Sequence, residues 1–414
     1  MTLSNVNNTP LRPFEPMVLD CLGEISAAIL KSPVGRQFPD LTAFAFYICK
    51  ANLQKLATAL PPDEFRLGRG LCFHVAPANI PINFAFSWVF SLLAGNANVV
   101  RLPSKDFPQV DALLAIITEV LGKCPELQGR NAFVKYPRTD NATTAAYCQM
   151  ADCRMIWGGD RTIASIKALP TKPRCVDICF ADRYSVALIN AEAILKADDA
   201  QIARLAQDFY NDTYLMDQNA CSSPQVILWE GADIEKAQER FWSAVEDVAK
   251  DKYVLQDAVA VDKYTLFCEE AVNNPAIKSV VRKENLLYRV ELECLIGKPR
   301  NTLNTRKCED GKEEEEISCD SCISWFDLTA HHGKAGFFFE YVLKDREEFF
   351  SVVTEKFQTI TQFGIDALEL AQQIASGHLR GIDRIVPIGK AMDIGVFWDG
   401  HDLIRELSRI VALA

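Results

Sequence analysis

Cys221 stands among small and polar residues, directly before an apolar run with the composition of a strand. The segment reads Asp217-Gln218-Asn219-Ala220-Cys221-Ser222-Ser223-Pro224-Gln225. A turn at the edge of a strand leaves a thiol partly exposed beside backbone N–H groups, which stabilise the thiolate over a thiol of pKa ~8.5. The pattern suggests a nucleophilic cysteine, although most cysteines in proteins are inert buried hydrophobes.

Asn79 stands in a loop bounded by two prolines, Pro77-Ala78-Asn79-Ile80-Pro81. Proline fixes φ, so such a loop is rigid and can hold the Asn79 amide as a fixed N–H donor. The oxyanion of an acyl-transfer reaction requires fixed donors, because they need no reorganisation during the reaction. The alternative is an asparagine that satisfies the backbone of the turn, and the sequence favours neither.

The turn Trp157-Gly158-Gly159-Asp160 follows an apolar run and precedes a helical pattern. Glycines at that point let a phosphate approach the N-terminus of the helix, where free N–H groups and the helix dipole favour anions. The sequence has no complete G-x-G-x-x-G motif. A Gly-Gly-Asp turn that only caps the helix explains the pattern equally well.

A zinc site is a further candidate, formed by Cys308, Cys319, Cys322 and either His331 or His332. The spacing of Cys319 and Cys322 is that of zinc ligands, but sites of this kind usually contain two close pairs. Both cysteines lie in the acidic stretch from Asn301 to Ser324, which is expected to be exposed, and two free thiols fit there equally well. No metal site is therefore predicted.

The elements that would position these residues alternate between strands and helices. Strands are expected at 70–75, 98–102, 132–135, 155–157, 184–189 and 225–229. Helices are expected at 20–31, 41–60, 84–93, 107–121, 162–169, 234–250 and 257–276, and a pair of helices is expected over 191–213. Two shorter α/β passages, 337–364 and 383–414, end the sequence. This alternation predicts a parallel, doubly wound sheet.

The composition is that of a globular protein, with 414 residues of which 49% are hydrophobic and 24% are charged. At roughly 150 residues per domain, this length predicts two or three domains. The net charge of −11 disfavours binding to nucleic acid or to an anionic membrane, because proteins that bind these are usually basic. The 14 cysteines are irregularly spaced and the polar N-terminus has no signal-peptide pattern, so a cytoplasmic protein with free thiols is expected.

The stretch from Leu71 to Val100 contains His74 as its only acidic or basic residue and is long enough to span a bilayer. Prolines and asparagines interrupt it at Pro77, Asn79, Pro81, Asn83, Asn96 and Asn98. A membrane helix with so many breakers and amides would be costly. We therefore expect a buried strand, a polar loop and a buried helix, and no membrane span.

The order of these segments resembles that of the aldehyde dehydrogenase superfamily. Residues 77–81 and 93–104 resemble its "PWNFP…AGNxVVxKPS" run, residues 157–160 take the place of its "TGS" turn, and residues 218–221 resemble its "GQxC" loop. The LuxC-type acyl-CoA reductases of this superfamily are a closer match. The segments similar to theirs are Trp157-Gly158-Gly159-Asp160, Gln218 to Gln225, Phe357-Gln358-Thr359, Arg384-Ile385-Val386-Pro387-Ile388-Gly389 and Trp398-Asp399-Gly400-His401-Asp402-Leu403.

The resemblance implies an α/β protein with an aldehyde-dehydrogenase-like architecture. A doubly wound nucleotide-binding domain with a parallel sheet would comprise residues 1–190, an α/β catalytic domain with the cysteine would comprise 191–380, and a C-terminal segment, 381–414, would return to the first domain. Cys221 would attack an acyl thioester and hold the acyl group. Asn79 and the backbone N–H of Cys221 would bind the oxyanion, and a nicotinamide hydride would reduce the acyl-cysteine to an aldehyde.

One departure from the superfamily concerns the activation of water. The hydrolytic relatives carry a general-base Glu in an "ELGGK" segment. The corresponding stretch here, Cys175 to Asp182, contains no Glu, and neither Asp177 nor Asp182 is assigned this role. An enzyme that reduces its acyl-cysteine benefits when water is not activated, so this absence favours thioester reduction over aldehyde oxidation.

A second departure concerns the coenzyme. The family's "KPSE" becomes Leu102-Pro103-Ser104-Lys105, so Lys105 replaces the Glu that holds the ribose hydroxyls in relatives, and Arg101 lies nearby. Cations attract a 2′-phosphate that a carboxylate would repel, so NADPH is expected in preference to NADH. The residues expected to contact the coenzyme are Pro77, Arg101, Ser104, Lys105, Gly158, Gly159 and Asp160.

The sequence thus predicts NADPH-dependent reduction of a fatty acyl thioester, carried by CoA or by a protein, to a fatty aldehyde. The resemblance also implies a homo-oligomer and a partner that supplies acyl groups, such as an acyl-protein synthetase. One alternative is an aldehyde dehydrogenase or a CoA-acylating semialdehyde dehydrogenase that uses Cys221 and Asn79 on a smaller substrate. The other is a non-enzymatic binding module of the same fold, against which the presence of both residues argues.

Overall fold

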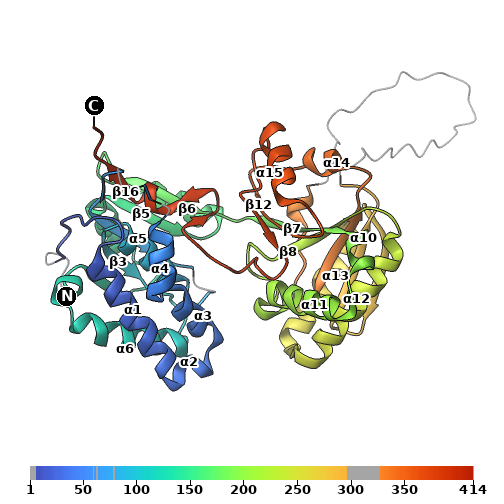
Figure 1. Ribbon diagram of the computed structural model, residues 1–414, viewed down its shortest axis with the longest axis horizontal. Helices are drawn as coiled ribbons and strands as arrows, with labels where there is room; N and C mark the ends of the chain where they lie inside the picture. The colour runs from blue at the N-terminus through green and yellow to red at the C-terminus, as the bar shows by residue number, and fades with distance from the viewer. Residues whose placement is uncertain (1–5, 59, 62–63, 78–79, 296–326, 414) are drawn as a thin grey trace, which may run out of the picture. The chain divides into compact units, whose positions relative to one another are not determined.

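The computed structural model describes residues 6–58, 60–61, 64–77, 80–295 and 327–413 (Figure 1). The chain forms two compact units. Unit 1 comprises Met1–Asp182 and Gly395–Ala414, and unit 2 comprises Arg183–Ile394. The sequence predicts domain boundaries near residues 190 and 380. Whether the chain folds as separate domains with these boundaries stays a prediction.

Unit 1 is built on a five-stranded parallel sheet. Its strands are β2 (Leu71–Val75), β3 (Ala97–Arg101), β4 (Asn131–Val134), β5 (Cys153–Trp157) and β6 (Val176–Phe180), in the order β4-β3-β2-β5-β6. Every neighbouring pair of these strands is parallel. The chain runs outwards from β2 to β4 and then returns to the other side of β2, so the strand order reverses between β2 and β5. Such a reversal creates a crevice at the carboxyl ends of the strands, where open α/β sheets bind ligands.

Helices cover both faces of this sheet. The helices of unit 1 are α1 (Pro16–Lys31), α2 (Pro33–Gln37), α3 (Pro39–Tyr47), α4 (Lys50–Ala57), α5 (Asn83–Leu93), α6 (Pro108–Gly122), α7 (Pro125–Gln128), α8 (Asn141–Met150), α9 (Asp160–Lys167) and α16 (Leu403–Glu406). The side chains of β2 alternate between the two faces, as the period of a strand requires. Phe73 packs with Tyr147 of α8, whereas His74 bonds to the Ser87 hydroxyl of α5 at 2.8 Å.

The apolar stretch from 71 to 100 forms β2, α5 and β3, as the sequence predicts. Nearly every side chain of α5 is buried, which explains why this helix lacks a polar face. None of the helices formed by the described residues has the length and apolar character that a membrane span needs.

The prediction of a single helix at 41–60 is wrong, because the chain forms two helices there, α3 and α4. Cys49 between them has an extended backbone, with φ −66° and ψ 146°, which breaks the helical path. The Ser26 hydroxyl of α1 donates to the carbonyl oxygen of Ala45 at 2.7 Å, so α3 is held against α1 by a side chain distant in sequence.

Two short antiparallel pairs complete unit 1. β1 (Arg66–Gly68) pairs with β16 (Ser408–Ile410), and β14 (Phe397–Trp398) pairs with β15 (His401–Asp402). The pairing of β1 with β16 places the last described residues of the chain in unit 1.

Unit 2 is built on a seven-stranded sheet. Its strands are β7 (Tyr184–Asn190), β8 (Pro224–Glu230), β9 (Ile277–Lys283), β10 (Leu287–Leu292), β11 (Phe337–Val342), β12 (Phe357–Phe363) and β13 (Arg384–Pro387), in the order β13-β12-β7-β8-β11-β10-β9. β9 pairs antiparallel with β10, and the other neighbouring pairs of the described sheet are parallel. The central parallel strands, β7, β8, β11 and β12, are mostly buried on both faces, as this arrangement requires.

Two helical layers bury the faces of the unit 2 sheet. α10 (Ala191–Lys196), α11 (Asp199–Thr213) and α12 (Ile234–Lys252) share one apolar cluster with the sheet, which includes Phe209 and Trp242. α13 (Asp257–Asn273), α14 (Arg346–Phe350) and α15 (Ala367–Ser376) contribute to the cluster on the other face, which includes Phe349 and Leu370. Burial of each large side chain in these clusters contributes roughly 1.5–3 kcal/mol. The sheet is therefore a rigid base for the loops at its edges.

Candidate active site

Cys221 lies in unit 2, in the loop between α11 and β8, where the sequence predicts a turn at a strand edge. After α11 the chain forms one turn of 3-10 helix, Tyr214–Met216. Asp217 and Gln218 then both adopt left-handed backbone conformations, with φ of 49° and 59°. Residues other than glycine rarely adopt this backbone conformation, so the loop keeps it only because its surroundings fix it. Cys221 is half-buried.

Gln218 is the residue that fixes this loop. Its buried amide nitrogen donates to the carbonyl oxygen of Phe337 at 2.9 Å, and its amide oxygen accepts from the Gly336 N–H at 3.2 Å. The Gln225 amide donates to the Gln218 carbonyl oxygen at 3.2 Å, and the Tyr253 hydroxyl donates to the Asp217 carboxylate at 2.5 Å. Bonds to β8, β11 and α12 thus compensate for the backbone strain.

The Cys221 sulfur accepts a hydrogen bond from the amide of Gln358, at 3.5 Å between Nε2 and Sγ. Gln358 is buried on β12, two strands away from β8 across the sheet. The carbonyl oxygen of Cys221 accepts from the Ser185 hydroxyl at 2.7 Å, and the Thr359 N–H donates to the same hydroxyl at 3.2 Å. A donor beside the sulfur favours the thiolate, because the charged form is the stronger acceptor.

Arg384 begins β13, directly opposite Thr359 in the register with β12. Its guanidinium donates to the carbonyl oxygens of Ala391 at 3.1 Å, Lys390 at 3.2 Å and Asp393 at 3.1 Å. Burial lowers the pKa of Arg384 below its ordinary value, and the negative charges of Asp393, Cys221 and Asp212 counteract part of this effect. The Cys221 thiol therefore lies within the electrostatic field of a guanidinium.

Asp212 is a buried carboxyl group at the end of α11. It accepts from the Gly389 N–H at 2.6 Å and from the Ala391 N–H at 3.0 Å. Burial raises the pKa of Asp212 to about 7, and these two N–H donors oppose the increase. The group therefore joins α11 to the loop that contacts Arg384.

Asn79, the predicted oxyanion donor, lies with Ala78 outside the described residues. Its role beside the backbone N–H of Cys221 therefore stays a prediction. Pro77 is described and is separated from the end of β2 by one residue.

The residues predicted to contact the coenzyme follow the carboxyl ends of three parallel strands of unit 1. Pro77 follows β2, Arg101 ends β3 with Ser104 and Lys105 exposed beyond it, and Gly158, Gly159 and Asp160 follow β5. Because the carboxyl ends of parallel strands meet at one edge of a sheet, the structure brings these residues to the same edge. Whether they bind a coenzyme remains a prediction.

A cavity of about 730 Å³ opens at the first turn of α9. It is lined by Arg138, Gly159, Asp160, Arg161, Thr162, Ser165 and Asp182. The Arg138 guanidinium donates to the Thr162 hydroxyl at 3.2 Å, so one cation is oriented along the cavity wall. A helix N-terminus with cations beside it fits the phosphates of a dinucleotide. The sequence indicates the two glycines and Asp160 but not Arg138.

The two cations predicted to select NADPH differ in how they are held. The Arg101 guanidinium lies over the Tyr136 ring, 4.6 Å from its centroid, which fixes its position next to β4. The Lys105 ammonium is exposed and lies 5.3 Å from the centroid of the Phe107 ring. Both cations therefore follow β3, where the resemblance places the ribose-binding residue.

β6 occupies the stretch that corresponds to the general-base segment of the relatives. Its Asp177 carboxylate accepts from both Nε and Nη2 of the buried Arg154, at 2.7 and 2.5 Å. A carboxylate paired in this way neutralises a buried charge, so its role is structural. Asp182 lines the cavity at α9 instead.

The zinc ligands considered in the sequence analysis are not assembled among the described residues. Cys308, Cys319 and Cys322 lie outside them. The His331 ring nitrogen pairs with the Glu270 carboxylate at 2.7 Å, and the His332 ring contacts the Tyr184 ring edge to face. The described part of the chain contains no group of three or more side chains arranged to bind a metal.

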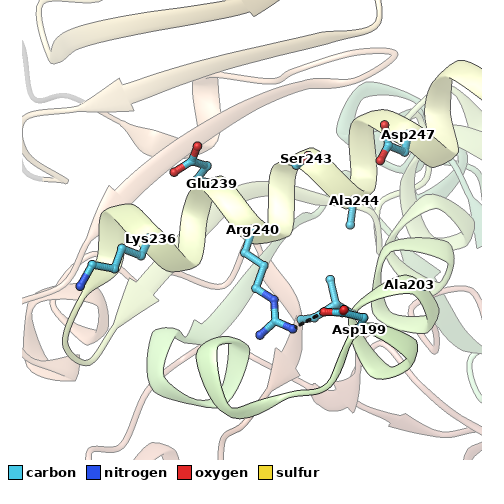
Figure 2. Close-up of a pocket in the computed structure, with 9 residues that line it drawn as sticks. Asp199, Ala203, Lys236, Glu239, Arg240, Ser243, Ala244 and Asp247 are labelled. Carbon is cyan, nitrogen blue, oxygen red and sulfur yellow. Dashed lines mark hydrogen bonds and ion pairs between the residues drawn. The ribbon is translucent and has the colours of Figure 1, made fainter.

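A cavity of about 470 Å³ lies between α11 and α12 in unit 2 (Figure 2). Charged residues of both signs line it, and the Arg240 guanidinium pairs there with Asp199 at 2.8 Å. Figure 2 shows Lys236, Glu239, Arg240 and Asp247 along α12 facing different directions rather than converging on one point. No predicted site residue lines this cavity, and we assign it no role.

The match to a family of known proteins comes from residues 63–260, slightly less than half of the chain. The family is described as acyl-CoA reductase (LuxC). The resemblance to this family that the sequence predicts is confirmed by the match. The matched segment includes the Cys221 loop and the residues of unit 1 that are predicted to contact a coenzyme, and it indicates an oxidoreductase that acts on aldehyde or acyl groups.

Solved structures show which fold this chain has. An oxidoreductase from Marinobacter aquaeolei is 12% identical, with 99% of this chain and 87% of that chain covered and a TM-score of 0.60. Lactaldehyde dehydrogenase from Escherichia coli is 12% identical, with 96% and 86% covered and a TM-score of 0.60. An NAD-dependent benzaldehyde dehydrogenase from Corynebacterium glutamicum is 12% identical, with 95% and 84% covered and a TM-score of 0.57. The predicted aldehyde-dehydrogenase-like fold is confirmed, and no protein of curated function matches the sequence.

Sequence reasoning did not assign roles to Gln358, Arg384 and Asp212. The first two lie in segments that carry the family resemblance, and both are polar residues at or next to the start of a strand. A polar side chain at such a position is the signal that could have drawn attention to them. Nothing in the local sequence distinguishes Asp212 from other acidic residues near helix ends.

Proposed function

We propose that this protein reduces a fatty acyl thioester to a fatty aldehyde with NADPH, through an acyl group bound to Cys221. The observation that carries the proposal is the half-buried Cys221 thiol, in a braced loop beside the Gln358 amide and within the field of Arg384. The family match supports the acyl thioester as the substrate class. The solved neighbours with dehydrogenase names support a nicotinamide coenzyme.

In the proposed reaction, Cys221 Sγ attacks the carbonyl carbon of the thioester as a thiolate. The Sγ–C bond forms, the bond from that carbon to the carrier sulfur breaks, and the carrier leaves as a thiol after it takes up a proton. Asn79 and the backbone N–H of Cys221 bind the oxyanion, and loss of one such donor typically costs about 10²–10³ in rate. The aldehyde is released when the reduced adduct collapses and Sγ leaves as a thiolate again.

The coenzyme, when bound, supplies the hydride that reduces the acyl carbon. The residues at the carboxyl edge of the unit 1 sheet fit such a group, because the cavity at α9 presents Gly159, Arg138 and Arg161 to a pyrophosphate. Arg101 and Lys105 supply the positive charge that a 2′-phosphate would require. The stretch around β6 offers no Glu to activate water, which protects the acyl-cysteine from hydrolysis.

The test follows NADPH oxidation and aldehyde release with acyl-CoAs of graded chain length, for the wild type and for Cys221→Ala. The wild type is expected to consume one NADPH for each aldehyde, and the variant is expected to do neither. Intact-mass measurement without NADPH should show one acyl group on the wild type and none on the variant. Full turnover by Cys221→Ala would refute the proposal.

The alternative of an aldehyde dehydrogenase is favoured by the names of the solved neighbours. Oxidation of aldehydes with NADP⁺ in the absence of CoA distinguishes it, because that reaction needs an activated water. We expect no such turnover. An acyl-protein synthetase as the donor of acyl groups and assembly into a homo-oligomer are further parts of the proposal, which pull-down with an acyl-loaded donor and sedimentation velocity would test.

A further inference from the structure

The guanidinium of Arg384 is held by a loop rather than by its own strand alone. Its three carbonyl acceptors, from Lys390, Ala391 and Asp393, all belong to the loop that follows β13. Three bonds from one planar group to one loop fix both the position and the plane of the guanidinium. The position of this charge therefore depends on the conformation of residues 389–393.

The 389–393 loop is in turn fixed to the elements that carry the cysteine. The Asp212 carboxyl group accepts from two N–H groups of the loop, those of Gly389 and Ala391. The carbonyl oxygen of Asp212 accepts from the hydroxyl of Ser223 at 2.7 Å, and Ser223 lies two residues after Cys221. The Ser222 hydroxyl also contacts the Met392 sulfur at 3.6 Å. The Cys221 loop, the end of α11 and the 389–393 loop thus form one hydrogen-bonded network.

The charged groups around this network have opposite effects on a thiolate at Cys221. Asp208 and Asp212 of α11 and Asp393 of the loop are acidic, and each would disfavour a thiolate nearby. Lys390 is exposed and pairs with Asp393 at 2.9 Å, so these two charges largely offset each other. Arg384 is half-buried, where charges are less screened than at the surface. It is the cation in this network whose field reaches Cys221.

We propose that Arg384 stabilises the Cys221 thiolate electrostatically and that Asp212 is a positioning residue, which acts by holding the loop that orients Arg384. This inference rests on the proposed role of Cys221 as the nucleophile. Gln358 supplies a neutral donor to the same sulfur, and Arg384 supplies the charge.

Alkylation by iodoacetamide tests this inference without any turnover. In this reaction the Cys221 thiolate attacks the methylene carbon, an S–C bond forms and iodide leaves. The rate is measured by peptide mass spectrometry from about pH 6 to about pH 10, because it follows the thiolate fraction. Cys268, which is exposed on α13, serves as an internal reference in every sample.

Arg384→Met is expected to move the midpoint of Cys221 alkylation upwards by about one pH unit or more and to reduce the rate at neutral pH about tenfold. Arg384→Lys keeps the charge and should restore most of the wild-type midpoint. Arg380→Met removes an exposed cation from the segment just before β13 and should leave the midpoint unchanged. An unchanged midpoint in Arg384→Met, or an equal shift in Arg384→Lys, would overturn the electrostatic role.

Asp212→Asn tests the positioning role, because an amide cannot accept from both loop N–H groups as a carboxylate does. Removal of the Asp212 charge alone would lower the midpoint, so an upward shift, smaller than that in Arg384→Met, would come from release of the loop that orients Arg384. An unchanged midpoint would overturn this part. If Cys221→Ala kept full turnover, the proposed function would fail, yet the alkylation profiles would still report whether Arg384 stabilises this thiolate.

Discussion

At the scale of single residues, Gln218 does more than its place in the cysteine motif suggests. Its amide pairs with β11 and the Gly336 N–H, and it holds two consecutive residues in left-handed conformations. The loop that carries Cys221, the proposed nucleophile, therefore depends on Gln218 for its conformation. The motif combines one residue for chemistry with one residue for local geometry.

Gln218→Ala should destabilise the protein and slow its chemistry together. The carbonyl of Phe337 and the N–H of Gly336 would lose buried partners, at a cost of about 1–3 kcal/mol. Urea unfolding measures this loss, and Cys221 alkylation measures the change at the thiol. Asn219→Ala, at the exposed neighbouring position, should stay within about 0.5 kcal/mol of the wild type. Equal stabilities of the two variants would contradict the assigned role.

Lys105→Glu should change the preference between the two coenzymes. A carboxylate at this exposed position would repel a 2′-phosphate, so kcat/KM with NADPH should fall about tenfold or more while that with NADH does not. Steady-state rates with both coenzymes provide the measurement. Lys167→Glu changes the charge equally at the end of α9 and serves as the control. A parallel loss with both coenzymes would show that Lys105 does not contact the phosphate.

At the scale of elements, the sequence predicts well those that have a single strong pattern. The continuous apolar runs of β2 and α5 and the amphipathic pattern of α12 were sufficient. β9 was not predicted because its side chains are almost all exposed on an edge strand, and α8 because its residues are small and polar. In these two elements, contacts with the rest of the fold decide the structure, rather than local sequence preference.

The candidate site likewise combines a feature with a local sequence pattern and contacts between residues that are distant in sequence. The turn that carries Cys221 could be predicted from its own sequence, because small and polar residues directly before an apolar run indicate the edge of a strand. Gln358 is 137 residues away from it, and the approach of Arg384 depends on the register of β13 against β12. Strand order and register are not encoded in any local pattern, so neither contact could be derived from the sequence.

The turn before β11, which packs against the Gln218 and Gln225 side chains, should tolerate no side chain at Gly333. A Cβ there would collide with the carbonyl oxygen of Phe337 and approach the Gln218 amide at 3.2 Å. Gly333→Ala should therefore cost about 1–3 kcal/mol and lower the alkylation rate of Cys221. Gly122→Ala, where an added Cβ has no neighbour within 4 Å, should be neutral or stabilising by up to about 1 kcal/mol. Thermal unfolding of both variants provides the comparison, and a harmless Gly333→Ala would show that the turn can move.

At the scale of the whole molecule, stability should carry the signature of one buried lysine. Lys263 donates to the carbonyl oxygens of Ala335 at 2.8 Å and Asn285 at 2.9 Å, and it lies 4.3 Å from the centroid of the Tyr288 ring. Burial, aided by the charge of Arg282, lowers the pKa of Lys263 from 10.5 to about 7. Between these two values the unfolded chain binds a proton that the folded protein does not.

The free energy of unfolding should therefore rise with pH across the window from about 7 to 10.5, because stability increases wherever the unfolded state binds more protons. This contribution is complete above the unfolded pKa and is lost as the pH falls through the folded one. Lys263→Met removes the titrating group, so the free energy of unfolding of the variant should depend less on pH in this window. The variant should also be less stable at every pH, because the carbonyl oxygens of Asn285 and Ala335 lose this donor. Urea unfolding at intervals from about pH 7 to about pH 10 measures both effects. The same slope in the variant and the wild type would mean that the lysine stays charged in the folded protein, with its carbonyl partners outweighing burial.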